Sequence, residues 1–394
     1  MTTRETLFTG AEAPVPAEAA NGGEFGRSPL EGYVLGEMPT DLRAVSEGQM
    51  TYEELAEKHN AILEEMAPHI DNNTDRHTAE MTHMDLMFMF GSYIPAGEDM
   101  YRKAPPSLMS LMQQHGDQHQ LEPFMTYEQI VDLNSAEYLR TGNMRVYADG
   151  EAGVAERDFY LGHHLAEPHA KRAAYKLHQL VEQPHLVDAT ALLSSAREDL
   201  DEFKRYMGRY AGLSKEHFAY FRQYLGSYAD GTRNASGAFM PSVQLLELAM
   251  LDPTEQYDVY MEESMRYFPR WSQSVMHEWR AQSGYGANVE SMVDRGQLEL
   301  DDEATKELIG VVDEFINFRM AHLGITKAQI PEAFSSLEQL TRRHIGAQDG
   351  EKQIMDPKYR GTAGFDVRNV LTNSAFRLLK FRERLVGSAE EEAA

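Results

Sequence analysis

The sequence predicts an all-α fold in which a small N-terminal helical domain precedes a large helical domain. Almost every segment between residues 29 and 388 has the apolar spacing of amphipathic helices and is bounded by residues that start or end helices. Alternating runs of the kind that form β-strands are scarce. The length of 394 residues suits two or three domains, or one large helical body with a buried pocket.

Composition divides the chain into segments. Residues 1–28 are rich in Thr, Ala, Pro, Glu and Gly and lack periodicity, which predicts a disordered tail. A loop-rich helical block, 29–150, is the predicted small domain, and residues 151–388 are the predicted large helical domain. A polar stretch with several glycines, 142–156, lies between the two. Residues 389–394 are expected to form a solvated acidic tail.

The charge balance narrows the classes of partner. The chain has 63 acidic and 37 basic residues, a net charge of −26, which argues against a nucleic-acid binder because such proteins need a cationic surface. No apolar run approaches the ~18 residues of a membrane span, and the N-terminus lacks the pattern of a secretory signal. We therefore expect a cytoplasmic protein with no membrane partner. The sequence leaves its oligomeric state open.

The chain contains no cysteine. Disulfides, cysteine-ligated zinc or iron–sulfur sites, a thiolate nucleophile and a thiolate-bound haem are therefore excluded. Any metal or cofactor must be held by His, Asp, Glu, Tyr or Met, and 15 histidines make such a site feasible.

A predicted helix at 307–330 carries a histidine within an apolar stripe. The stripe repeats at spacings of three and four residues and consists of Leu308, Val311, Phe315, Phe318, His322 and Ile325. The commoner outcome of such a pattern is a core histidine that is hydrogen-bonded to a backbone carbonyl. The functional alternative is an axial metal ligand that points into an apolar pocket. The stripe alone does not decide between them.

A second predicted helix, 214–228, places a charge on its apolar face. Arg222 shares this face with Phe218, Phe221 and Leu225. A buried guanidinium needs an anion, because its desolvation otherwise costs several kcal/mol. The anion is either a structural Asp or Glu or, in the functional alternative, a substrate carboxylate held by two parallel hydrogen bonds.

Two loops rich in small residues precede predicted helices. The stretch DGTRNASGAF comes before Pro241, a residue suited to a first helical position, and KYRGTAGFD precedes another amphipathic run. Such loops allow the backbone to approach a flat ligand closely. Neither has the frame of a phosphate-binding loop.

The segment RDFYLGHHLAEPH concentrates aromatic and titratable residues. His163 and Glu167 are one helical turn apart, a spacing that suits metal ligation and also an ordinary helical pair. Pro168 is expected to bend or end the helix at this point.

Taken together, these motifs resemble the haem-dependent tryptophan and indoleamine 2,3-dioxygenase superfamily, and most closely its monodechloroaminopyrrolnitrin synthase-like branch. The segment FRMAHLGITK is similar to the family's R-x-x-H helix, which implies that His322 is the proximal ligand of a haem b iron. The segment HFAYFRQYL is similar to the signature F-F-x-x-x-R-x-Y-L. This similarity implies that Phe218 packs on the substrate ring and that Arg222 holds the substrate carboxylate.

The remaining motifs complete the resemblance over about 230 residues. RGTAGFD resembles the family's G-T-G-G substrate loop, which implies that Gly361 and Thr362 contact the amino-acid group of the substrate. The other two motifs, NASGAFMPSVQLLE and DFYLGHHLAE, resemble the distal loop and the distal helix, with His163 over the open side of the iron. The residues expected at the substrate in these two motifs are Ser236, Gly237, Ala238, Phe159 and Tyr160.

The resemblance implies a haem-dependent oxygenase that acts on a tryptophan-like amino acid with O2, with ring-opening dioxygenation as the leading reaction. Three positions depart from the family pattern: His217, Ala363 and Pro168. These departures favour a substrate other than plain tryptophan. They keep a pyrrolnitrin-type rearrangement or a hydroxylation open as alternatives.

Two further alternatives come from other classes of protein. A di-iron helical oxygenase needs two Glu-x-x-His motifs, and the chain has Glu80–His83 and Glu182–His185, the second interrupted by a proline. A haem-binding sensor without catalysis, or an acidic interaction module, also fits the composition. Finally, His115 and His119 have the spacing of a metal-binding pair, but their polar surroundings favour surface histidines.

Overall fold

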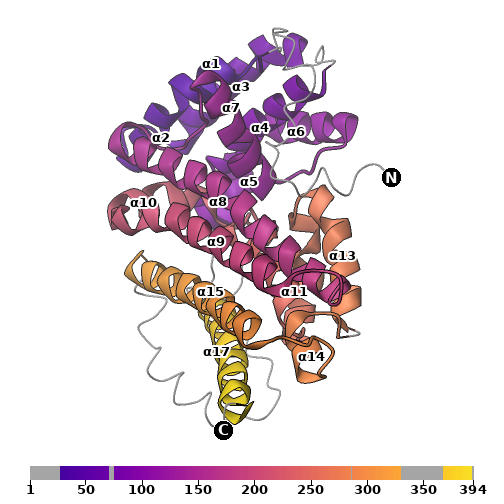
Figure 1. Ribbon diagram of the computed structural model, residues 1–394. Coiled ribbons are helices and arrows are strands. Elements are labelled where there is room, and N and C mark those ends of the chain that lie inside the picture. Colours follow the sequence, from indigo (N-terminus) through magenta and orange to yellow (C-terminus); the bar gives the residue numbers. More distant parts are fainter. Residues whose placement is uncertain (1–26, 71–74, 285, 330–366, 393–394) are drawn as a thin grey trace.

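The computed structural model describes residues 27–70, 75–284, 286–329 and 367–392 (Figure 1). Within these ranges every regular element is helical and no strand occurs, which confirms the all-α prediction. None of the described helices is long and apolar enough to cross a membrane. The predicted tail, apart from its last two residues, lies outside the described residues.

The N-terminal helices form a layer around one fully buried helix, α4 (Arg76–Gly91). From Thr78 onward, Glu80 is its one side chain that is not buried, and α1, α6 and the π-helical turn η3 pack against it. Because its neighbours enclose this helix, its second half is a continuous apolar run, Leu86–Phe90, and its buried polar residues Asp85 and His83 are hydrogen-bonded. The other elements of this layer are α1 (Glu31–Gly36), α2 (Met38–Ser46), α3 (Tyr52–Ile70), η2 (Ile94–Asp99), α5 (Met100–Lys103), α6 (Pro106–His119), η3 (Glu128–Leu133) and α7 (Asn134–Thr141).

The longest helix, α8 (Gly150–Glu182), crosses the middle of the molecule and organises the rest (Figure 1). It packs along α9 (Ala189–Met207) and α11 (Pro241–Met250), while α15 (Asp302–Gln329) packs on α9 and on α17 (Val367–Glu392). The remaining elements are η4 (Gly208–Gly212), α10 (Lys215–Arg222), η5 (Gln223–Leu225), η6 (Gly237–Phe239), α12 (Glu255–Ser264), η7 (Met265–Tyr267), α13 (Arg270–Gly284) and α14 (Val289–Asp294).

The sequence predicted that Pro168 would bend or end its helix, and in the structure it does not end the helix. Pro168 lies inside α8, which continues for 14 residues beyond it to Glu182. A proline within a helix loses one backbone hydrogen bond. Here α9 and α11 pack along α8, and we attribute the continuity of the helix to that tertiary packing. The helix also begins at Gly150, inside the polar stretch that the sequence suggested as a separator.

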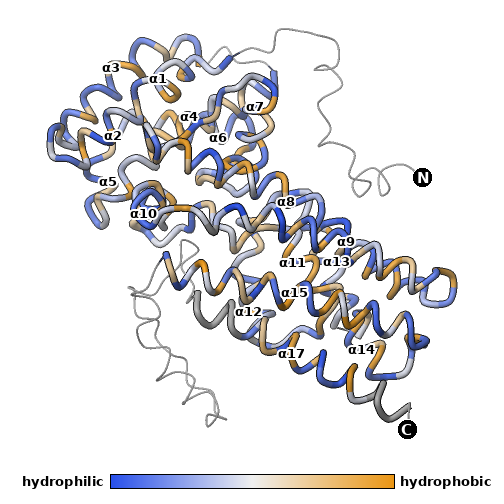
Figure 2. Tube along the Cα trace, turned by 60° about the vertical axis from the view of Figure 1, so that its left-hand side comes forward, coloured by the Kyte–Doolittle hydropathy of each residue, from blue (hydrophilic) through white to orange (hydrophobic). Residues whose placement is uncertain are grey.

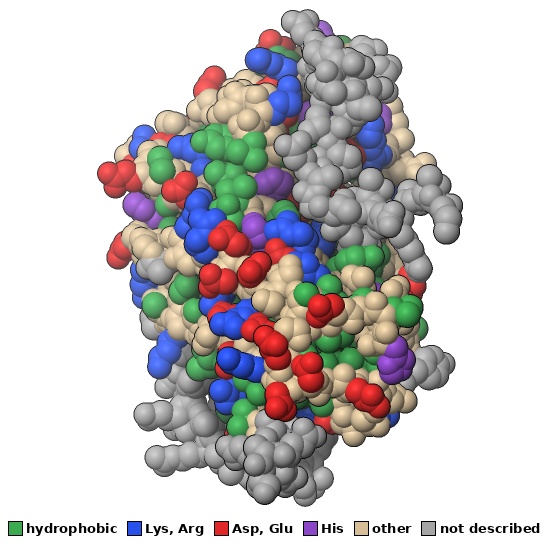
Figure 3. Space-filling model, viewed as in Figure 1, with side chains coloured by type: hydrophobic (Ala, Val, Ile, Leu, Met, Phe, Trp, Pro, Cys, Tyr) green, Lys and Arg blue, Asp and Glu red, His purple; other side chains and the backbone are tan. Residues whose placement is uncertain are grey.

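The hydrophobic core is continuous across the two predicted domains. A single cluster of buried residues extends from Leu30 in the N-terminal layer to Leu385 in α17. Along most helices hydrophobic and hydrophilic positions alternate in short stretches (Figure 2). The division into two domains therefore stays a prediction. On the face in Figure 3, acidic and basic side chains are interspersed across the middle. The acidic end predicted at 389–394 is helical as far as Glu392.

Candidate functional site

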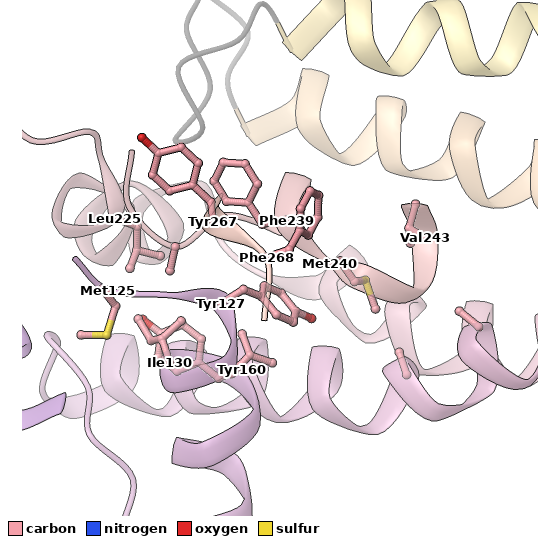
Figure 4. Packing of buried hydrophobic residues seen from close by; sticks show 14 of the residues in the cluster. Met125, Tyr127, Ile130, Tyr160, Leu225, Phe239, Met240, Val243, Tyr267 and Phe268 are labelled. Atoms are coloured by element: carbon pink, nitrogen blue, oxygen red, sulfur yellow. The ribbon is translucent and has the colours of Figure 1, made fainter. Parts of the chain in front are cut away.

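A cavity of about 270 Å³ lies where α8, α10 and α15 approach one another. Most of its wall is apolar, and the π-helical turn η3, the end of α9 and the segment around η6 close its sides. Figure 4 shows part of this packing, in which Tyr127, Tyr160, Leu225 and Val243 come from different elements of the fold. An apolar cavity with a few polar groups is the usual form of a small-molecule site.

The cavity collects most of the residues that the sequence singled out. The predicted site residues in its wall are Phe159, Tyr160, His163, Phe218, Arg222, Ser236, Gly237, Ala238 and His322. The other two, Gly361 and Thr362, lie outside the described residues. Four segments of the chain, distant in sequence, thus meet at one place.

His322 lies on α15, one turn after the buried part of the apolar stripe. Its Nδ1 is buried and makes no hydrogen bond to any described residue. A core histidine would use this nitrogen for a backbone carbonyl, so its isolation does not fit that alternative. Burial lowers the pKa of His322 to about 3, which keeps the imidazole neutral at pH 7. Neutral imidazole is the form that ligates iron.

His163 lies on α8 and is 6% exposed. Its Nδ1 is 2.8 Å from the carbonyl oxygen of Phe159 and 2.8 Å from the Tyr210 hydroxyl. Because the carbonyl oxygen can only accept, Nδ1 carries the proton, and the Tyr210 hydroxyl donates to the same carbonyl at 2.9 Å. The other nitrogen, Nε2, is then an acceptor. Burial lowers the pKa of His163 to about 4, so the ring is neutral.

Two glycines lie beside this arrangement, and one of them, Gly162, is required for it. A Cβ atom at Gly237 would lie 3.7 Å from His163 Nε2, so the loop backbone passes close to the acceptor nitrogen. A Cβ atom at Gly162 would lie 2.6 Å from the Tyr210 hydroxyl, which a side chain there would displace. Sequence reasoning missed Tyr210, because an isolated tyrosine in MGRYAGL carries no motif.

The neighbours of His163 on α8 have different partners. His164 faces Asp132, with Nδ1 3.2 Å from a carboxylate oxygen. Glu167 is buried and accepts from the backbone nitrogen of Ser242 at 3.0 Å and from its hydroxyl at 2.7 Å. This carboxyl group therefore binds the first turn of α11, where a negative charge is favourable. Burial raises the pKa of Glu167 to about 7. The metal-binding pair of His163 with Glu167 is not formed.

Arg222 ends α10 and is part-buried at the cavity. Among the described residues no carboxylate pairs with it, and its nearest described aromatic partner is Phe218, with the ring centre 6.0 Å from the guanidinium carbon. Burial lowers the pKa of the guanidinium below its usual value. The sequence left open whether a structural Asp or Glu pairs with Arg222. No such carboxylate occurs among the described residues.

Arg319, the arginine of the R-x-x-H motif, holds α15 in place. Its Nη2 donates to Glu247 Oε1 on α11 at 2.5 Å, and Ser374 on α17 donates to the same oxygen. The Arg319 and Glu247 side chains are both buried. Arg319 also lines the cavity one turn before His322, so this ion pair positions the helix that carries the histidine.

The structure also places the residues of the other metal sites that the sequence suggested. Glu182 ends α8 and His185 is exposed beyond it, so this pair does not lie on a helix. In the described ranges no three His, Asp or Glu side chains are arranged to hold a metal ion as they stand. His115 is 3% exposed, so the expectation of a surface histidine was wrong; it packs against His83 from α4.

No protein-family model matches this sequence, and no curated protein matches it significantly. The interpretation of the cavity therefore depends on its own chemistry: an apolar wall, an acceptor nitrogen, and an imidazole and a guanidinium that have no partner among the described residues.

Proposed function

We propose that this chain is a haem-dependent oxygenase that opens the ring of a tryptophan-like amino acid with O2. The observation that carries the proposal is the convergence of His322, His163 and Arg222 on one cavity. In the described part of the chain, His322 Nδ1 has no hydrogen-bond partner and no carboxylate pairs with Arg222, while His163 offers Nε2 as an acceptor.

The residues present fit a haem. His322 offers a neutral imidazole with an unpartnered buried nitrogen, on a helix held by the Arg319–Glu247 ion pair. The apolar wall and the small residues at Gly237 and Ala238 suit a flat macrocycle. When bound, the haem would supply the iron and the oxidising power for O2 chemistry.

The protein would bind and orient the substrate. Arg222 would pair with its carboxylate, and this anion would supply the partner that the guanidinium lacks. Phe159 and Phe218 would enclose the aromatic ring. His163 Nε2, as an acceptor, would take a hydrogen bond from the indole N–H. Orientation in a pocket that excludes water is the contribution that such a site makes to the rate.

An absorption spectrum of the purified chain tests the haem. We expect a Soret band that His322→Ala abolishes or makes dependent on added imidazole, while the exposed control His185→Ala leaves it unchanged. An unchanged band and haem content in His322→Ala would reject His322 as the ligand. His344, which lies outside the described residues, would then be the next candidate.

The products test the reaction. Reduced protein is incubated with O2 and either tryptophan or 7-chlorotryptophan, and the products are identified by mass. A formylkynurenine-type product with both oxygen atoms incorporated is the expected result. An aminophenylpyrrole or a singly hydroxylated ring would reject dioxygenation in favour of rearrangement or hydroxylation. The absence of turnover would favour a haem-binding sensor.

A further inference from the structure

Tyr210 lies beside His163 in the wall of the cavity, and the mechanism proposed above gives it no role. It belongs to η4 and is 7% exposed. The ring centre of His163 lies 4.5 Å from that of Phe159 and 4.9 Å from that of Tyr210, and the two outer rings are 5.1 Å apart. The His163 and Tyr210 rings are stacked at 22°. The neighbouring rings therefore restrict how the imidazole can turn.

The hydroxyl of Tyr210 completes the hydrogen bonding of His163 Nδ1. Phe159 lies inside α8, where each carbonyl oxygen accepts the backbone N–H four residues later, here that of His163. The proton on Nδ1 therefore shares an acceptor that is already in use, at 2.8 Å. The Tyr210 oxygen is a second acceptor, also at 2.8 Å, and it donates its own proton to the Phe159 carbonyl at 2.9 Å. Without this hydroxyl, Nδ1–H would keep only the shared carbonyl.

This arrangement decides which nitrogen of His163 can accept a hydrogen bond. Nδ1 is within hydrogen-bond distance of two oxygens, whereas Nε2 makes no hydrogen bond to any described residue. Because a neutral imidazole has one donor and one acceptor nitrogen, a proton held on Nδ1 leaves Nε2 as the acceptor. Nε2 lies near the backbone of Gly237, which also lines the cavity. A ligand group that reaches Nε2 must therefore donate.

Both side chains stay neutral near pH 7, so the position of the proton decides their behaviour. Burial lowers the pKa of His163 to about 4, while the Phe159 carbonyl and Asp132 act in the opposite direction. Burial raises the pKa of the Tyr210 hydroxyl above its ordinary value, so this group stays protonated. The hydroxyl can therefore donate to Phe159 and accept from Nδ1 at neutral pH.

Gly162 keeps the space that the Tyr210 hydroxyl occupies. A Cβ atom at this position would lie 2.6 Å from the hydroxyl oxygen and 3.0 Å from two ring carbons, so Tyr210 would have to move. Glycine inside a helix is less favourable than alanine, so α8 carries this residue at a cost in local stability. Because Gly162 does not itself line the cavity, a substitution there reaches His163 through Tyr210.

We propose that Tyr210 is a positioning residue that holds His163 in the tautomer protonated at Nδ1, with Nε2 as the acceptor for an N–H donor on the ring of the bound ligand. The hydroxyl acts through the imidazole, because its own proton is used by the Phe159 carbonyl. The identity of the ligand rests on the proposed function, whereas the tautomer of His163 is a property of the free chain.

The ring ¹⁵N chemical shifts of His163 test the tautomer in the purified chain, and His163→Gln identifies its signals by their loss. At pH 7 we expect a protonated Nδ1 and an unprotonated Nε2 in the wild type. In Tyr210→Phe, which keeps the ring but removes the hydroxyl, both shifts should move toward the average of two tautomers. Tyr206→Phe is the matched control, because Tyr206 packs against His169 instead, and it should leave His163 unchanged. A protonated Nε2 in the wild type, or unchanged shifts in Tyr210→Phe, would overturn the proposal.

A pair of ligands tests the consequence for binding. Tryptophan carries a ring N–H, and β-(3-benzothienyl)alanine has a sulfur atom in its place at nearly the same size. We expect the wild type to prefer tryptophan about 5–10-fold, the effect of one net hydrogen bond. The preference should fall to about 2-fold or less in Tyr210→Phe and in Gly162→Ala, because Nε2 is then no longer held as an acceptor. Calorimetric titration gives the affinities, and Tyr206→Phe should retain the preference.

Arg222→Met separates this inference from the proposed function. It should weaken both ligands equally, because both carry the carboxylate. If tryptophan binds and depends on Arg222, while Tyr210→Phe keeps the full preference over the sulfur analogue, the positioning role is overturned and the proposed ligand class stands. If the wild type binds neither ligand, the proposed ligand class fails, and the ¹⁵N shifts alone then uphold or overturn the role of Tyr210.

Discussion

Two buried arginines in this molecule have opposite surroundings. Arg145, in the N-terminal layer, is 1% exposed and faces Asp85 through Nε at 2.7 Å. Arg222, at the cavity, is withdrawn from water without a carboxylate among the described residues. The fold supplies the counterion of the first guanidinium, and we propose that a ligand supplies that of the second.

The histidines repeat this difference. His59 in the N-terminal layer bonds the Tyr33 hydroxyl through Nε2 at 2.9 Å and the Tyr93 hydroxyl through Nδ1 at 3.0 Å. His322 in the cavity has no partner for Nδ1 among the described residues. A buried polar group that has its hydrogen-bond partners stabilises one conformation of the protein. A buried polar group without a partner lowers the stability of the fold until a ligand binds to it. His322 is therefore a candidate for contact with a ligand at the cavity.

The largest effect on stability is expected at the buried ion pair between Arg145 and Asp85. Asp85→Ala leaves Arg145 buried and uncompensated, which should lower the free energy of unfolding by about 3–5 kcal/mol. Urea unfolding followed by circular dichroism measures the change. The double substitution Asp85→Leu with Arg145→Met should recover most of the loss. A loss below about 1 kcal/mol for Asp85→Ala would mean that the two arginines are not different in kind.

Arg222→Met should act on binding instead of stability. Loss of the guanidinium is expected to weaken binding of tryptophan by about 2–5 kcal/mol, and that of tryptamine, which lacks the carboxylate, far less. The free energy of unfolding should stay equal or rise, because a desolvated charge is removed. Calorimetric titration and urea unfolding give both quantities, with exposed Arg209→Met as the control. Equal losses for the two ligands would make Arg222 a structural residue.

Two buried carboxyl groups, Asp85 and Glu167, also differ in their partners. Asp85 pairs with a guanidinium, whereas Glu167 is hydrogen-bonded by the neutral Ser242. Burial raises the pKa of Glu167 to about 7, above its ordinary value of 4.5. Its contribution to stability is therefore full below pH 4.5 and is lost as pH rises through 7. We expect Glu167→Gln to remove roughly 2 kcal/mol of this decline between pH 5 and pH 8. If the free energy of unfolding changed with pH equally in the wild type and in Glu167→Gln, the raised pKa would not belong to Glu167.

The smallest effect is expected at the third buried arginine, Arg319. Glu247→Gln keeps an acceptor for Arg319 but removes the charge, which should cost about 1–2 kcal/mol of unfolding free energy. The exposed pair of Arg205 with Glu202 supplies the control, since Glu202→Gln should change stability by under about 0.5 kcal/mol. A Glu247→Gln variant as stable as this control would show that the pair does not hold α15.

The helices were predictable from the sequence because their apolar spacing and their caps are local. The stripe from Leu308 to Phe318 is buried as predicted, and α15 spans 302–329 where the sequence indicated 307–330. The effect of Pro168 was not predictable, because the packing that we hold responsible for α8 continuing past it comes from α9 and α11. Likewise, the sequence around His115 predicts a surface position, and only the packing of His83 from another helix against it shows that it is buried.

The amino-acid sequence by itself determined that this protein is helical and that it cannot use cysteine chemistry; it also showed that His322 and Arg222 stand on apolar helix faces. Only the tertiary structure decided that these faces meet at one cavity, and that Arg145 receives a carboxylate while Arg222 receives none from the described residues. The physical reason is that periodicity reports which side of a helix is buried, whereas the partner of a buried charge comes from a distant segment.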